Sequence, residues 1–288
     1  MFLNIYRWIF ENMIGKNHSE ITNNALNSYL NSNALDFVKQ GNLDSDRVPR
    51  YTLKNVTDGY NINAQHSNNT SLSECSEFLK DSKEVIVEDF IEALNADGKD
   101  KEKLYQQAFY DLGRSIHSVQ DFYSHTNWIN QTGEDVLIWN EDAEDINLDN
   151  PEKLKTSKYT KFGQFFEKIN PFFLDKIKKN YDAIYNEGEK NFSHYVISKD
   201  EKGSIADILF EKETGVSGYE LASQDAVKHT EQKWLDVIEE LRNELTSEEF
   251  EKLNNEILNF ESDIENYNKN SIEYRESFNK DMKEVSGE

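Results

Sequence analysis

Three side chains of types that bind metals recur at intervals of four residues near the middle of the chain. His117, Asp121 and His125 offer an imidazole, a carboxylate and a second imidazole. Each step of four residues along an α-helix turns the side chain by about 40°, so the three fall within an arc of about 80°. Zinc accepts both kinds of ligand. The spacing therefore predicts a metal-binding stripe on a helix; the alternative interpretation is a helix face on which polar residues coincide by chance.

The residues around this stripe predict the helix that must carry it. Apolar side chains recur at helical spacing from Glu102 to Trp128, and Ile116, Val119 and Phe122 flank the stripe. Polar side chains placed among them need partners, and a metal ion supplies one. Gly113 lies on the same stripe, where the lack of a side chain lets another segment or a ligand approach closely.

The rest of the chain is also predicted to be mostly helical. Three prolines and twelve glycines in 288 residues force few breaks. Further helices are predicted over residues 19–30, 71–94 and 162–185 and from residue 218 onward, with loops or irregular structure at residues 41–70, 133–157 and 188–218. We therefore expect an all-α fold, with one helical domain at residues 1–245 and a charged helical extension at residues 246–288.

The excess of acidic residues limits the classes of ligand that the chain is expected to bind. Its 55 acidic and 32 basic residues give a net charge of -23. This charge repels nucleic-acid backbones and anionic lipid surfaces on average, so a nucleic-acid partner is not expected. The single cysteine, Cys75, rules out an intramolecular disulfide and a zinc cluster built from thiolates.

The first residues of the sequence, MFLNIYRWIFENMIG, are apolar but interrupted by Arg7 and Glu11. They lack a cleavage site of small residues, so we do not expect a signal peptide. The run is too short and too charged to span a bilayer, and no transmembrane segment is expected. These features favour a cytoplasmic protein or export by a route that needs no signal peptide.

A longer motif surrounds the metal-binding stripe. Residues 106–129, QQAFYDLGRSIHSVQDFYSHTNWI, resemble the core motif of the zinc-dependent phospholipase C superfamily, in which one helix carries two zinc ligands. The form HSVQDFYSHTNW is similar to the Het-C (heterokaryon incompatibility) branch. The resemblance extends from Lys16 to about Asn130 and more weakly beyond. It implies a multi-helix bundle with long ordered loops, of the kind shared by phospholipases C and single-strand-specific zinc nucleases.

The resemblance also implies a set of metal ligands. GKNHSEITNNAL resembles the first-helix motif of the family, GNLDSD the next ligand motif and AQHSNN the one that follows. Two or three zinc ions are then implied, with these residues as candidate ligands: His18, Asp46, His66, His117, Asp121 and His125. Asp44 and Asp58 are alternatives to Asp46, and a solvated histidine is the alternative for His66.

The sequence departs from the family pattern in its later part. The secreted phospholipases complete their site with a His and a Glu four residues apart, and this chain has no such pair. NFSHYVISKD resembles a later segment of the Het-C-like proteins, which implies His194 and Asp200 as replacements. Trp8 is more simply a packing residue than the N-terminal zinc ligand of the secreted enzymes. Asp225 and His229 are four apart on the last long helix, where a capping or core role is favoured over ligation.

These features favour a zinc-dependent phosphodiester hydrolase, of phospholipase C type, that acts on phospholipids at a membrane surface. Asp46 is the candidate general base, because by resemblance it both contacts metal and lies near the attacking water. One alternative is a non-enzymatic, metal-stabilised module of toxin or incompatibility type, which the missing His–Glu pair motivates. A further alternative is a single-strand-specific nuclease, against which the acidic charge weighs.

Overall fold

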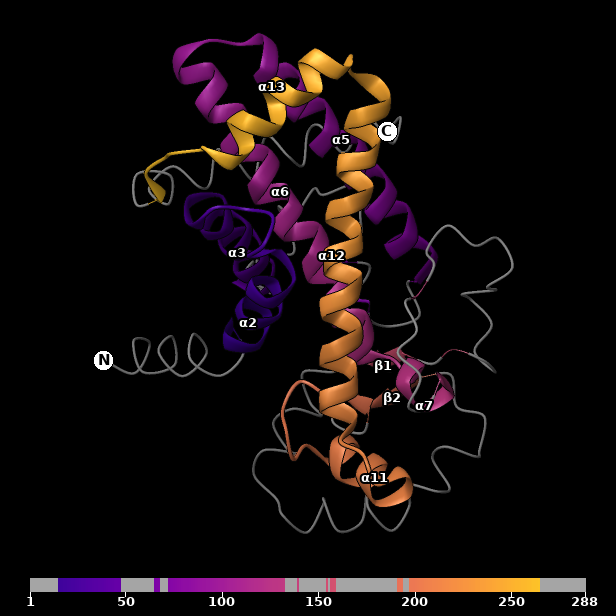
Figure 1. The fold of residues 1–288 in the computed structure, drawn as a ribbon. Coiled ribbons are helices and arrows are strands. Elements are labelled where there is room, and N and C mark those ends of the chain that lie inside the picture. The colour runs from indigo at the N-terminus through magenta and orange to yellow at the C-terminus, as the bar shows by residue number, and fades with distance from the viewer. Residues whose placement is uncertain are drawn as a thin grey trace. The chain divides into compact units, whose positions relative to one another are not determined.

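The computed structural model describes residues 15–47, 65–67, 72–132, 139, 154, 156–158, 191–193 and 197–264. The helices of this part are α2 (Gly15–Leu26), α3 (Ser32–Arg47), α5 (Leu72–Asn95), α6 (Gly98–His125), α7 (Trp128–Thr132), α11 (Ile205–Thr214), α12 (Gly218–Glu244) and α13 (Ser247–Leu258) (Figure 1). A short parallel sheet pairs β1 (Thr156–Lys158) with β2 (Asn191–Ser193), with Thr156 opposite Asn191. The all-α class expected from the sequence is confirmed.

Two predicted irregular regions contain helices. The prediction of loops from residue 41 is wrong as far as Arg47, because α3 continues through the Asn- and Asp-rich stretch. The prediction of irregular structure at residues 188–218 is wrong for α11. That helix begins at Ser204, whose side chain accepts a hydrogen bond from the Asp207 amide, and ends at Gly215 in a left-handed conformation. The helix predicted at residues 162–185 lies outside the described residues.

The described residues divide into two compact units. The first unit comprises α2, α3, α5 from Glu77, α6 up to His117, α12 from Val227, and α13. The second unit comprises residues 65–67 and 72–76, the rest of α6, α7, both strands, α11 and the start of α12. Helices α6 and α12 therefore each contribute residues to both units.

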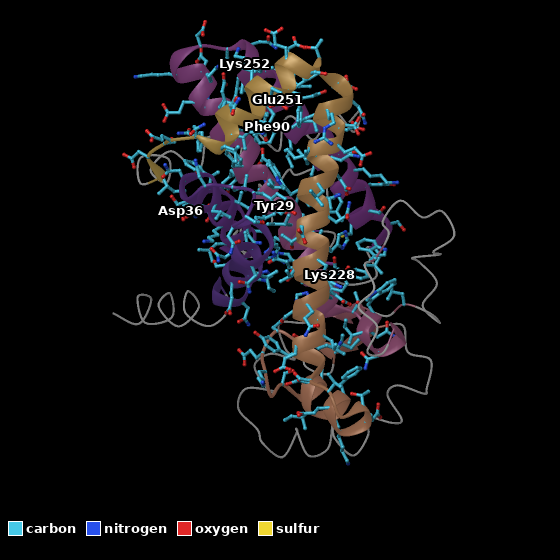
Figure 2. All side chains as sticks on the ribbon, viewed as in Figure 1. Tyr29, Asp36, Phe90, Lys228, Glu251 and Lys252 are labelled. Atoms are coloured by element: carbon cyan, nitrogen blue, oxygen red, sulfur yellow. The ribbon has the colours of Figure 1, made fainter. Side chains whose placement is uncertain are left out.

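The core of the first unit is built around aromatic side chains. Phe90 on α5, labelled in Figure 2, is fully buried. It meets Phe109 and Trp234 edge to face, with ring centroids 5.3 and 6.2 Å apart. Edge-to-face packing of this kind is a favoured aromatic geometry and adds to the free energy of burial. The apolar stripe of α6 that was recognised in the sequence thus forms the centre of this core.

Helices α3 and α6 approach each other backbone to backbone. A Cβ atom added to Gly113 would lie 2.1 Å from the carbonyl oxygen of Val38, and one added to Gly41 would lie 1.9 Å from that of Tyr110. No side chain fits at either position, so the two glycines allow a contact that any other residue would prevent. The close approach expected at Gly113 is therefore confirmed, and its partner is α3.

The segment after α12 is helical and contributes to the same core. α13 begins with a capping box, in which Thr246 and Glu249 bond each other's backbone amides. Its Leu253 and Ile257 are 1% exposed and belong to the core cluster of the first unit. Glu256 accepts hydrogen bonds from Tyr105 Oη at 2.7 Å and from Lys101 Nζ at 2.9 Å, both on α6.

The second unit contains a polar junction between α11 and α12. Asp207 accepts hydrogen bonds from the amides of Gly203 and Tyr219 and from the hydroxyl of Ser217. Burial raises the pKa of Asp207, but these hydrogen bonds outweigh burial and lower it below its usual value. Across the part of the chain that the structure describes, no helix is both long and apolar enough to cross a membrane.

Candidate metal centre

Two histidines and one carboxylate of the first unit converge on a small space. Asp46 Oδ1 lies 3.7 Å from His117 Nε2, and Asp46 Oδ2 lies 4.0 Å from His18 Nε2. The two imidazole rings are 4.5 Å apart between centroids. We call His18, Asp46 and His117 the first cluster. It draws its side chains from α2, α3 and α6, and the close approach of α3 to α6 at the two glycines brings Asp46 within reach of His117.

The distances in the first cluster are too long for hydrogen bonds. Two ligand atoms that each lie about 2.1 Å from a tetrahedral zinc ion are about 3.4 Å apart. The separations of 3.7 and 4.0 Å between imidazole nitrogen and carboxylate oxygen exceed this value by a few tenths of an ångström. The spacing therefore fits an ion between the side chains better than it fits direct bonds among them.

One oxygen of Asp46 is left without a hydrogen bond. Oδ2 is enclosed, and nothing in the described part of the chain donates to it. An enclosed carboxylate oxygen without a donor is costly, because it has lost water and gained nothing in exchange. A cation bound between Asp46 and the two histidines would remove that cost. The donor set and the enclosed oxygen together fit a divalent metal.

The orientation of His117 is set by a residue that the sequence did not single out. Asn42 Oδ1 lies 3.1 Å from His117 Nδ1, and Asn42 Nδ2 donates to Thr22 Oγ1 at 3.3 Å. Because the carbonyl oxygen of Asn42 only accepts, Nδ1 of His117 donates this hydrogen bond. Nε2 is then the ring nitrogen that faces Asp46 and can bind a metal. Asn42 precedes Asp46 by one helical turn, and this spacing in GNLDSD was the available clue.

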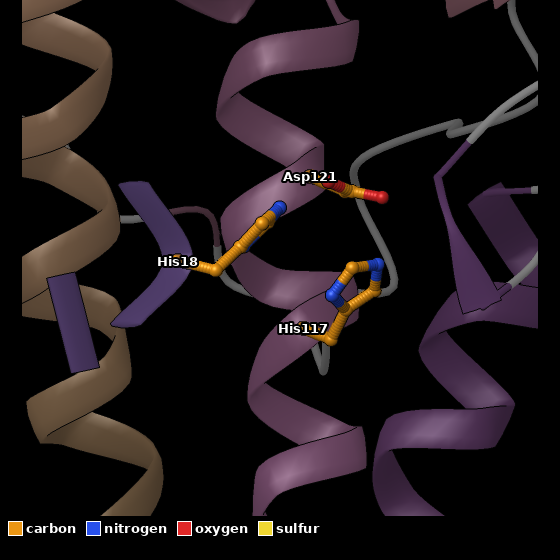
Figure 3. A group of neighbouring side chains, drawn as sticks. All are labelled: His18, His117 and Asp121. Atoms are coloured by element: carbon orange, nitrogen blue, oxygen red, sulfur yellow. The ribbon is translucent and has the colours of Figure 1, made fainter. Parts of the chain in front are cut away.

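Helix α6 continues the row of ligand-type residues. His117 and Asp121 lie on successive turns and offer ligand atoms within 4.8 Å of each other, while His18 approaches His117 from α2 (Figure 3). Both α6 residues are buried, at 0% and 2% exposure. The predicted stripe on one helix face is thus present as a buried surface.

The second unit holds a further group, His66, Asp121, His125 and Asp200, which we call the second cluster. His66 Nδ1 donates to Asp121 Oδ2 at 2.8 Å, and His125 Nδ1 donates to the backbone oxygen of His66 at 3.1 Å. His125 Nε2 lies 3.2 Å from Asp200 Oδ1. In all three of His66, His117 and His125, Nδ1 is therefore committed to an oxygen, which is how metal-binding imidazoles are commonly oriented.

The segment that carries His66 is fixed to α6 by two serines. Ser118 Oγ donates to the backbone oxygen of Gln65 at 2.6 Å, and Ser67 Oγ donates to that of Ser118 at 3.0 Å. Ser67 has a φ of 48°, a left-handed conformation that is uncommon for a residue with a side chain. This reciprocal pair of hydrogen bonds holds His66 against Asp121. His66 is 4% exposed, so it is not the solvated loop residue of the alternative interpretation.

Charges in the second cluster alter the protonation of His125. Burial lowers the pKa of His125, but the negative charges of Asp121 and Asp200 outweigh it and raise the pKa to about 10. Without a metal, His125 is therefore a cation at neutral pH and pairs with Asp200. A metal that binds at Nε2 must displace this proton, so metal binding there releases a proton.

The remaining sequence candidates have different positions. Asp44, the alternative to Asp46, accepts a hydrogen bond from Tyr110 at 3.1 Å and is not in a metal-capable group of the described residues. Asp225 and His229 are buried on α12, at 1% and 2% exposure, and are likewise outside those groups of three ligand residues, as are His125 and Asp200. The alternative ligand Asp58, together with His194 and Trp8, lies outside the described residues.

A comparison with family models finds one similarity. Residues 39–151, less than half of the chain, match the model of the VWA7 N-terminal domain. The matched part contains both α6 histidines, together with Asp46 and His66, and it excludes His18 and Asp200. Comparisons with curated proteins and with solved structures find no significant match.

Proposed function

We propose that this protein is a zinc-dependent phosphodiester hydrolase of phospholipase C type. The observation that supports a metal is the first cluster: Asp46 Oδ2 is enclosed without a donor among the described residues and lies 4.0 Å from His18 Nε2, while Asp46 Oδ1 lies 3.7 Å from His117 Nε2. The resemblance of residues 106–129 to the zinc-dependent phospholipase C motif supports the choice of zinc and of a phosphodiester substrate.

In this proposal each cluster holds a divalent ion. The first ion is held by His18, Asp46 and His117, and the second by Asp121, His125 and Asp200, with His66 as a further candidate. Bound divalent ions polarise a phosphoryl oxygen, lower the pKa of water and neutralise charge on the leaving oxygen. The protein's part is to fix the imidazoles in one tautomer, as Asn42 does for His117, and to exclude bulk water from buried ligands.

Asp46 is the candidate general base. Its side chain is 18% exposed, more than that of His117 at 0%, so a water can reach it from one side. Its oxygens lie on the side of the two Nε2 atoms, and a carboxylate in this position can accept a proton from an attacking water. The same residue would then bind the metal and accept the proton.

A phospholipid is the proposed substrate because of charge. The net charge of -23 disfavours a long polyanion such as a nucleic acid, whereas a zwitterionic head group carries no net charge. Phosphatidylcholine vesicles are therefore the first substrate to test, with release of the phosphorylated head group as the readout.

The experiment compares two aspartates of α3 that lie two residues apart. Zinc content and vesicle hydrolysis are measured for the wild-type protein, Asp46→Asn and the matched control Asp44→Asn. We expect Asp46→Asn to lose the zinc ion of the first cluster and all hydrolysis. Asp44→Asn should retain both, because an amide oxygen can still accept the hydrogen bond from Tyr110. His117→Ala should behave as Asp46→Asn does.

The outcomes separate the proposal from its alternatives. A wild-type protein that holds no zinc, and takes up none when it is supplied, refutes the proposal. Bound zinc with no hydrolysis of lipid or nucleic acid would favour the non-enzymatic, metal-stabilised module. Cleavage of single-stranded DNA without lipid hydrolysis would favour the nuclease.

A further inference from the structure

The second unit contains a lysine that is almost completely buried. Lys199 exposes 2% of its surface, although lysines rarely leave solvent. An ammonium group taken out of water needs hydrogen-bond acceptors to offset the lost hydration. The hydrogen-bond partners of Lys199 therefore indicate which segments the buried side chain holds together.

Among the described residues, the hydrogen bonds of Lys199 go to the segment around its own position and to the end of α6. Its Nζ donates to the backbone oxygens of Thr126 at 3.0 Å and Ile197 at 3.2 Å, and its backbone amide donates to that of Ser124 at 3.1 Å. Ser124 and Thr126 flank His125, the last residue of α6. The carbonyl oxygens at the C-terminal end of a helix lack partners within the helix and attract cations.

The same short segment carries Asp200, the exposed member of the second cluster. We call residues 197–200 the strap. Ser198 Oγ donates to Asp200 Oδ2 at 2.5 Å, and Ser204 Oγ donates to the backbone oxygen of Ser198 at 3.1 Å. The Asp200 side chain is 37% exposed, so little packing restrains it. Its position 3.2 Å from His125 Nε2 therefore depends on how the strap is attached to α6.

We propose that Lys199 is the positioning residue of the second cluster: it fastens the strap to both sides of His125, so that Asp200 faces Nε2 of that histidine and the two can bind one divalent cation. The cation in this inference rests on the proposed function. Lys199 itself would not bind the ion, since its Nζ donates to two backbone carbonyl oxygens.

The first measurement is independent of any metal. Hydrogen exchange of the metal-free protein is followed by mass spectrometry for peptides that cover residues 197–204. We expect Lys199→Met, which keeps the length of the side chain but not its charge, to exchange there about tenfold or more faster, the factor expected from losing one charge-assisted hydrogen bond. The matched control is Lys202→Met, because Lys202 is exposed, is paired with Glu220 and lies three residues along the chain. It should exchange as the wild-type protein does.

The second measurement is zinc affinity by chelator competition, for Lys199→Met, Asp200→Asn and the double variant. We expect each single change to weaken the same binding step about tenfold to a hundredfold, as changes behind a metal ligand do. The double variant should be no weaker than Asp200→Asn, because Lys199 acts through Asp200. Lys199→Arg, which keeps a cation and its donors, should retain wild-type affinity within about threefold. If Lys199→Met fails to fold, Lys199→Gln takes its place, and Lys199→Arg is compared with it in the same way.

Two results would overturn this inference alone. One is unchanged exchange of the strap in Lys199→Met. The other is a loosened strap with unchanged zinc affinity, while Asp200→Asn weakens binding. If the wild-type protein binds no divalent cation, the proposed function fails and the positioning role fails with it.

Discussion

Replacing Asn42 with leucine tests how the imidazole of His117 is oriented in the first cluster. Leucine has a similar volume but offers no acceptor to His117 Nδ1 and no donor to Thr22 Oγ1. Asn42 is 1% exposed and His117 is 0% exposed, so water does not take the place of the amide. One buried hydrogen bond contributes about 1 kcal/mol, and a buried donor deprived of its acceptor costs about 1–3 kcal/mol more. We therefore expect a loss of about 2–4 kcal/mol in the free energy of unfolding.

The effect on zinc should exceed the effect of destabilisation alone. Loss of the bond to Nδ1 frees His117 to adopt the other tautomer, which would place a proton on the nitrogen that faces Asp46. We expect zinc affinity to fall about tenfold to a hundredfold. Urea denaturation of the metal-free protein measures the stability, chelator competition measures the affinity, and nitrogen-15 NMR reports the tautomer of His117.

Two further variants make the Asn42 test specific. Asn42→Asp keeps an acceptor for His117 and should retain the wild-type tautomer and zinc affinity. Thr22→Val removes the acceptor of the amide nitrogen, so by the same reasoning it should lower stability by about 2–4 kcal/mol while leaving zinc affinity unchanged. If Asn42→Leu binds zinc as tightly as the wild-type protein, the orienting role is refuted.

Two other predictions concern the fold around the first cluster. Gly113→Ala should lower the free energy of unfolding by about 3 kcal/mol or more in urea, because the new Cβ would lie 2.1 Å from the Val38 oxygen. Gly218→Ala is the control: its Cβ would meet a side chain at 3.2 Å, and a similar loss there would contradict the backbone argument. Burial raises the pKa of Glu256, but hydrogen bonds, first that from Tyr105, lower it below its usual value of 4.5. Its contribution, about 1 kcal/mol after allowing for solvent screening, is therefore present above pH 4.5 and is lost as pH falls through the lowered pKa. Glu256→Gln should destabilise more at pH 7 than at a pH low enough to protonate Glu256 in the wild-type protein; an equal loss at both values would exclude this origin.

The sequence predicted the main carrier of the candidate site because that carrier is a local pattern. Apolar residues at helical spacing indicated α6, and intervals of four placed His117, Asp121 and His125 on one face. The start of α12 at Gly218 was indicated in the same way. Local periodicity needs no knowledge of distant contacts, so it is readable from one sequence.

The parts that were missed depend on contacts between distant segments. The end of α3 has the composition of a loop, yet it is helical where Gly41 lies against the backbone of Tyr110. Asn42 became a candidate only when its amide was seen between Thr22 and His117. No sequence pattern pointed to Lys199, because its proposed role follows from its hydrogen bonds to two backbone carbonyl oxygens. Tertiary contacts of this kind override local preference.

The two clusters differ in how much they need a metal. In the second cluster, His66 is bonded to Asp121 at 2.8 Å and His125 is paired with Asp200 at 3.2 Å, so its polar groups already satisfy one another. A purely structural interpretation explains that cluster without an ion. In the first cluster, neither histidine places a nitrogen within 3.5 Å of Asp46, and Oδ2 is enclosed without a donor among the residues that the structure describes. Native proteins seldom bury a carboxylate oxygen in this way, because nothing offsets its lost hydration. The argument for a metal therefore depends chiefly on Asp46, rather than on the helix stripe that first suggested it.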